Sequence, residues 1–158
     1  MDVSDVALSL LSGILGSVVG VAATVKLHQD KERESFRAAA RVTHFEIAEN
    51  TSYLTLAISQ GITMPVRTTT WPETRGRLAG HLSPGDFVTV ATAYAKLAAN
   101  ETAWSLAPLK SPLSASGMQA TKEVLQRLAA AATVLERVGW PNKADQDELL
   151  EQLKEHIS

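Results

Sequence analysis

Hydrophobic residues are most concentrated near the N-terminus, where no charged residue occurs from Val6 to Val25. As a helix, this run of about 20 residues is roughly 30 Å long, which matches the hydrocarbon core of a bilayer. The pattern predicts a transmembrane helix within residues 1–27. A cleaved signal peptide and a buried core helix are the alternatives. A signal peptide begins with a basic region, but only Asp2 and Asp5 precede this run, and a core helix of this length usually has a polar face.

Small residues recur inside this run at every fourth position. One row consists of Ser12, Gly16, Gly20 and Thr24, and a second consists of Ser9, Gly13 and Ser17. Residues four apart share a helix face, and rows of small residues let two membrane helices approach closely. We expect these rows to form a packing face for a second copy of the chain or for another membrane protein. Glycine is also simply commoner in membrane helices, which is the alternative.

Basic residues flank this run on one side only. They are Lys26, Lys31, Arg33, Arg37 and Arg41, and none precedes Val6. Positive residues beside a membrane helix stay in the cytoplasm. The distribution predicts an N-terminus outside the cytoplasmic membrane and a C-terminal domain inside the cell.

The chain then continues to Gln60 without glycine or proline, which favours one long helix. Residues 28–35 are polar and mixed in charge, as expected of a solvated stalk. From Phe36 onward, apolar positions recur at helical spacing, with Asn50 in the middle of the apolar face. A second stripe on the far side predicts a helix sandwiched between neighbours: Val42, Phe45, Ser52 and Leu56.

Shorter amphipathic segments follow. A capping box at Thr70–Glu73 predicts a helix to Leu82, and Ser83 followed by Pro84 starts another. A clean apolar stripe then ends at Gly139. After Trp140–Asn142 a last helix is expected, with the apolar face Leu149, Leu150, Leu153 and Ile157. The fold class is therefore all-α: a transmembrane helix that continues into a long helix, followed by a bundle of four or five helices over 36–158.

Two polar groups attract attention as candidate sites. Asn50 is interpreted as a buried hydrogen-bonding residue that sets helix register, and a catalytic centre inside the bundle is the alternative. Glu46 is interpreted as solvated or paired with an arginine. Arg67, Arg75 and Arg77 surround Trp71. This combination can contact lipid headgroups, a phosphate or single-stranded nucleic acid; alternatively, Trp71 packs on the bundle and the arginines are solvated.

Composition excludes several chemistries. The chain has no cysteine, and its four histidines lack the spacing of metal ligands. No phosphate-binding loop, dinucleotide fingerprint or nucleophile elbow occurs. A net charge of −2 does not favour a nucleic-acid partner. We expect no metal, no cofactor and no catalytic residue.

The order of motifs resembles small single-pass membrane proteins of unknown function in bacteria, often actinobacteria, and their phages. The resemblance covers about Val6 to Leu97 and rests on "FEIAEN" at 45–50, on Trp71 followed by "LAGHL" at 78–82, and on "AYAKL" at 93–97. It implies an inner-membrane anchor and a cytoplasmic helical domain, without an activity to carry over.

These features predict a non-enzymatic scaffold that is anchored to the membrane and self-associates through its small residues. Two alternatives stay open. One is a membrane-perturbing oligomer of phage or toxin type. The other is an enzyme with a pocket inside the bundle.

Overall fold

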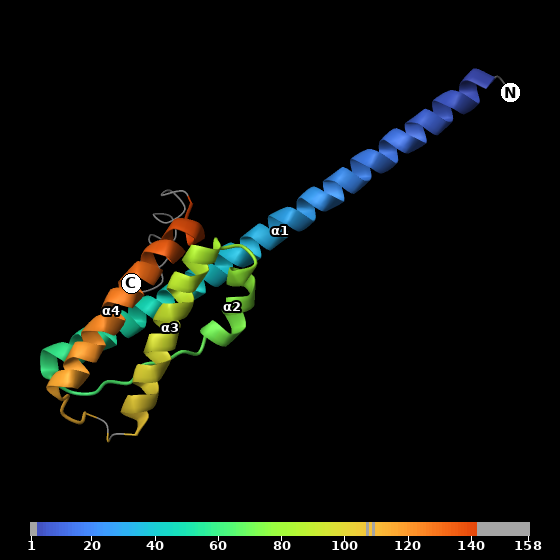
Figure 1. Cartoon of the computed structure of the whole chain (residues 1–158). Helices are drawn as coiled ribbons and strands as arrows, with labels where there is room; N and C mark the ends of the chain where they lie inside the picture. The colour runs from blue at the N-terminus through green and yellow to red at the C-terminus, as the bar shows by residue number, and fades with distance from the viewer. Residues whose placement is uncertain (1–2, 107, 109, 142–158) are drawn as a thin grey trace, which may run out of the picture. The chain divides into compact units, whose positions relative to one another are not determined.

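The described part of the chain is entirely helical. The computed structural model describes residues 3–141 except 107 and 109, with side chains from Thr24 onward. It contains four helices, α1 (Val3–Gln60), α2 (Trp71–Ala79), α3 (Pro84–Ser105) and α4 (Ala115–Gly139) (Figure 1). The only strand-like pairing among these residues is an isolated bridge between Ile62 and Pro112. The all-α prediction is confirmed, whereas the helix predicted after Asn142 lies outside the described residues.

The chain divides into two compact units, Met1–Ser35 and Phe36–Ser158. The boundary falls where the apolar face of α1 begins. Among the residues with described side chains, no helix is long and apolar enough to cross a membrane. Most of the predicted span, Val6–Val25, lies outside those residues.

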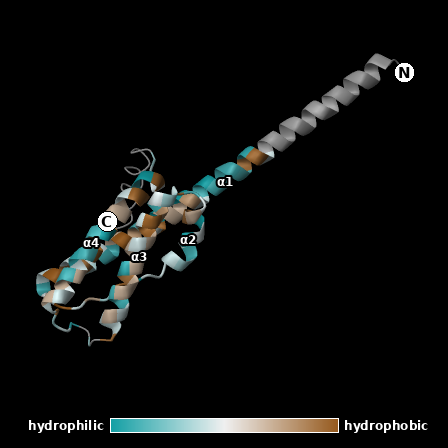
Figure 2. Cartoon of the chain, in the orientation of Figure 1, coloured by the Kyte–Doolittle hydropathy of each residue, from teal (hydrophilic) through white to brown (hydrophobic). Residues whose placement is uncertain are grey.

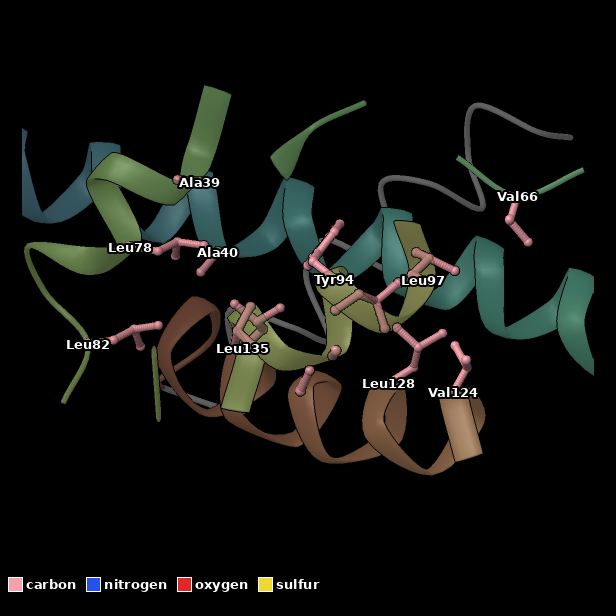
Figure 3. Packing of buried hydrophobic residues seen from close by; sticks show 14 of the residues in the cluster. Ala39, Ala40, Val66, Leu78, Leu82, Tyr94, Leu97, Val124, Leu128 and Leu135 are labelled. Atoms are coloured by element: carbon pink, nitrogen blue, oxygen red, sulfur yellow. The ribbon is translucent and has the colours of Figure 1, made fainter. Parts of the chain in front are cut away.

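The second unit is held together by one apolar core (Figure 3). Each helix contributes residues that recur at three- and four-residue spacing, which places them on one face. The innermost ones include Ile47 and Leu54 of α1, Leu78 of α2, Val90, Tyr94 and Leu97 of α3, and Leu128 and Leu135 of α4. Hydrophilic and hydrophobic residues both occur along the length of α3 and α4 (Figure 2), as expected of helices that are buried on one side.

The second apolar stripe of α1 is not covered by this core. Val42 and Phe45 are each 48% exposed, Leu56 is 38% exposed, and Ser52 is exposed as well. The prediction of a helix sandwiched on both sides is therefore wrong for the described residues. The physical reason is that the positions of α1 buried in the second unit, from Ala39 to Ala57, all belong to a single face.

α3 begins as the sequence predicts. The Ser83 hydroxyl accepts a hydrogen bond from the Asp86 amide (3.2 Å) and donates one to the Asp86 carboxylate (2.7 Å). Arg137 of α4 lies 2.8 Å from that carboxylate. The Ser83 hydrogen bond, together with Arg137, holds the pKa of Asp86 below its ordinary value. This contact ties the start of α3 to the end of α4.

α1 ends in a left-handed turn at Gly61, whose φ is +65°. The Ile62 amide donates to the Ala57 carbonyl (3.1 Å), which closes a Schellman-type cap. A side chain at Gly61 would be strained by this positive φ. The strain would come from the backbone alone, since a Cβ there would meet no atom within 4 Å.

Replacing Gly61 by alanine is expected to lower the free energy of unfolding by about 1 kcal/mol. Gly85 is a matched control, since a Cβ there also meets nothing but φ is not positive. Gly85→Ala should raise the free energy of unfolding by about 0.5 kcal/mol. Urea unfolding of the two variants would measure both effects, and changes of the same sign would contradict the assignment.

Candidate functional site

Asn50 of α1 fixes the extended segment that joins α1 to α2. Its side-chain carbonyl accepts from the Arg67 amide (2.9 Å), and its amide group donates to the Arg67 carbonyl (2.7 Å) and to the Glu46 carbonyl (2.9 Å). Asn50 is only 2% exposed. The side chain thus pairs with one residue of the segment as a neighbouring β-strand would, and it holds a loop rather than setting the register between two helices.

Glu46, one turn earlier, holds the same segment at its far end. One carboxylate oxygen accepts from the Thr70 amide and from the Thr69 hydroxyl, each at 2.8 Å. Glu46 is 7% exposed, so the interpretation of a solvated or arginine-paired carboxylate is wrong.

The capping box predicted at Thr70–Glu73 does not form. Thr70 precedes α2 in a helical conformation, and its side chain makes no capping hydrogen bond. In a capping box the carboxylate three residues onward binds the N-cap amide. Here Glu46 of α1 takes that place, so α2 is capped by a residue from another helix.

Tyr94 of α3 lies beside this anchor. Its hydroxyl donates to the Thr43 carbonyl at 3.3 Å. Thr43 in turn donates to the Thr74 hydroxyl of α2 at 2.9 Å. Burial raises the pKa of Tyr94, and the nearby Glu46 adds to this effect. The phenol therefore stays protonated and acts as a donor. These bonds cross-link α1, α2 and α3, which defines the cluster as a structural anchor.

Trp71 belongs to the same packing and is partly buried against the core. Its ring stacks on Tyr94 at 4.8 Å with an angle of 9° and on Phe87 at 5.9 Å with an angle of 26°. Arg67, Arg75 and Arg77 are exposed. The contact with lipid, phosphate or nucleic acid stays a prediction. It now depends on the arginines, because the Trp71 ring already packs against Tyr94 and Phe87.

An aromatic cluster that the sequence did not reveal lies where α4 ends against α1. The Trp140 ring packs edge-on against Phe45 (5.8 Å) and His44 (5.2 Å). Burial lowers the pKa of His44, and the charge of Glu136 opposes part of that effect. The one feature of the sequence that pointed to this cluster was the position of Trp140 at a helix end, between Gly139 and Pro141.

This cluster marks one end of the exposed apolar residues of α1. We name Val42, Phe45 and Leu56 the α1 stripe.

Among the seven small residues predicted to pack in the membrane, only Thr24 has a described side chain, and it is exposed. The rows formed by Ser12, Gly16 and Gly20 and by Ser9, Gly13 and Ser17 otherwise lie outside the described side chains.

No cluster of histidine and acidic residues that could hold a metal ion occurs among the described residues. Comparison of the chain with models of protein families, with curated proteins and with solved structures found no match. The resemblance to small single-pass bacterial proteins accordingly stays a prediction.

Proposed function

We propose that this protein is a non-enzymatic interaction protein of the bacterial inner membrane, anchored by its N-terminal helix and self-associating through the small residues of that helix. The observation that carries the proposal is the charge-free run Val6–Val25, followed only on its C-terminal side by basic residues. Such a run is long enough to span the hydrocarbon core.

The residues just after this run support the same proposal. Val25 and Leu27 are 50% and 57% exposed in the first unit, and Lys26 lies between them. Exposed apolar residues alternating with a lysine suit the membrane–water boundary, where a lysine can extend its ammonium group toward the headgroups. Anchoring would also raise the local concentration of the helical domain, so weak contacts between domains would become effective.

Membrane placement is tested with two C-terminal fusions of the full chain. Alkaline phosphatase should be inactive and green fluorescent protein should be bright, because the C-terminal domain is proposed to face the cytoplasm. Both fusions should sediment with membranes after a carbonate wash. An active phosphatase, or a fusion that stays in the supernatant, would overturn the proposed placement.

Self-association is tested by replacing Gly16 and Gly20 with isoleucine in a bacterial membrane two-hybrid assay. The two side chains fill the groove that close helix approach requires, so the signal should fall by about five-fold or more. Val18→Ile/Val21→Ile is the matched control, because it adds bulk outside the small rows. An equal signal from both variants would sink the small-residue interface, and collapse of the membrane potential on expression would favour the membrane-perturbing oligomer instead.

A further inference from the structure

α3 and α4 pack side by side (Figure 1) and leave a hollow of about 210 Å³ in the groove between them. Positions three or four apart share a helix face, so residues on successive turns form its two walls. Most of the lining is small and apolar: Ala99 and Ala103 of α3, and Ala120 and Val124 of α4. The volume equals that of about seven molecules of liquid water. The hollow therefore has room for one small molecule.

Asn100 of α3 also lines this hollow. The residue is 9% exposed, and its side-chain nitrogen has no hydrogen-bond partner among the residues that the structure describes. A buried donor without a partner is destabilising, and most buried polar groups in proteins are paired. The unpaired N–H of Asn100 therefore indicates that an acceptor belongs in the hollow.

Two opposite charges complete the lining, Lys96 on the α3 wall and Glu123 on the α4 wall. Both side chains are exposed, and neither forms an ion pair within the described part of the chain. A second hollow of about 280 Å³ adjoins the first, shares Lys96 and Glu123 with it, and is also lined by Arg127. The groove thus offers two cations and one carboxylate to a ligand.

We propose that the hollow binds a free amino acid with a short apolar side chain. The ligand's carboxylate accepts hydrogen bonds from Lys96 and from the Asn100 amide, and its ammonium group pairs with Glu123. Its side chain packs against the alanines and Val124. Small-molecule sites have this composition, an apolar lining with a few placed polar groups. Valine has about as many heavy atoms as the hollow holds water molecules.

Simpler ligands leave part of this lining unused. An amine without a carboxylate gives Asn100 no acceptor, and a carboxylate without an amine gives Glu123 no donor. A water molecule at Asn100 satisfies the amide alone and pairs with neither charge. An amino acid carries both charged groups on one carbon, so a single molecule meets the donors of α3 and the carboxylate of α4.

The site does not depend on membrane anchoring, because all its residues belong to the second unit. A ligand that binds only the folded domain stabilises it in proportion to the logarithm of ligand concentration. The bound amino acid would therefore strengthen the contact between α3 and α4 as its concentration rises.

Three matched probes test the site by ligand-observed NMR titration of the full chain in detergent. L-Valine carries both charged groups, isovalerate lacks the amine, and isobutylamine lacks the carboxylate. Valine should bind, and each truncated probe should bind about ten-fold more weakly, because it leaves a polar group of the site unpaired. No binding of valine at millimolar concentration, or equal affinities for the three probes, would overturn the proposal.

Variants of the two charged walls locate the binding. Lys96→Met and Glu123→Gln should each lower the affinity for valine about ten-fold, since each removes a charge-assisted hydrogen bond. In Glu123→Gln the preference for valine over isovalerate should also disappear, because the amine has lost its partner. Lys122→Met is the matched control: it removes the same charge from an exposed position of α4 that lines neither hollow. Equal affinities for valine in all three variants would contradict the assigned site.

Asn100→Leu separates binding from folding. Leucine keeps the approximate size of the side chain and removes the unpaired donor, so the midpoint of thermal unfolding without ligand should not fall. The affinity for valine should nevertheless drop about ten-fold, because the ligand's carboxylate loses a hydrogen bond. Full affinity in a folded Asn100→Leu variant would overturn the role of Asn100. If this variant does not fold, Lys96→Met and Glu123→Gln decide, because both alter exposed positions.

Discussion

Replacing Tyr94 by alanine is expected to lower the free energy of unfolding by about 4 kcal/mol, the largest effect of any change considered. Tyr94 is 1% exposed and lies at the centre of the core (Figure 3). Truncation would open a cavity between α1 and α3. It would also remove the ring on which Trp71 stacks, so α2 would lose its main aromatic contact.

Tyr94→Phe separates the ring from the hydroxyl. It keeps the stacking and loses only the 3.3 Å hydrogen bond to the Thr43 carbonyl, so the expected cost is about 1 kcal/mol. Urea unfolding of the purified full chain in detergent, followed by far-ultraviolet circular dichroism, measures both variants. Equal costs for alanine and phenylalanine would mean that the hydroxyl, and not the ring, stabilises the contact.

The second large effect is expected at Asn50. Alanine there should lower the free energy of unfolding by about 3 kcal/mol, because it leaves the backbone amide and carbonyl of Arg67 without their partners in a partly buried place. The segment between α1 and α2 should also open more often. Trypsin cleavage after Arg67 should therefore become faster, since a protease needs an extended, detached backbone.

Thr55→Ala is the control for the Asn50 variant. Thr55 is exposed on the same helix and donates only to the carbonyl one turn earlier, so its replacement should change stability by less than about 0.5 kcal/mol. If Asn50→Ala costs no more than Thr55→Ala, or if cleavage after Arg67 is unchanged, Asn50 does not anchor the segment.

The outcome at Asn50 and Glu46 shows how far helical periodicity reaches. Periodicity placed Asn50 on the buried face of its helix, and the structure confirms that burial. It said nothing about the hydrogen-bond partners, because these lie on a segment 17 to 24 residues further along. For Glu46 the expectation was wrong, since a carboxylate is buried only where donors meet it, and those donors are brought there by the turn at Gly61 and the path of the loop.

The α1 stripe illustrates the opposite limit. Val42, Phe45 and Leu56 satisfy the periodic criterion for a second buried face as well as many core residues do. Periodicity reports which residues share a side of a helix, and it does not count the neighbours available to cover that side. Within the described part of the chain, it is the arrangement of α2, α3 and α4 that leaves this face exposed.

The sequence by itself determined the helical class, the helix start at Ser83, the glycine stop after Gln60 and the apolar faces of α1, α3 and α4, because each depends on interactions within a few residues. The tertiary structure alone decided three things: that Glu46 caps α2, that Trp71 stacks on Tyr94, and that Trp140 meets Phe45. Each joins residues far apart in the chain, and such contacts form only after the helices have packed and the entropy of closing the loops has been offset by burial.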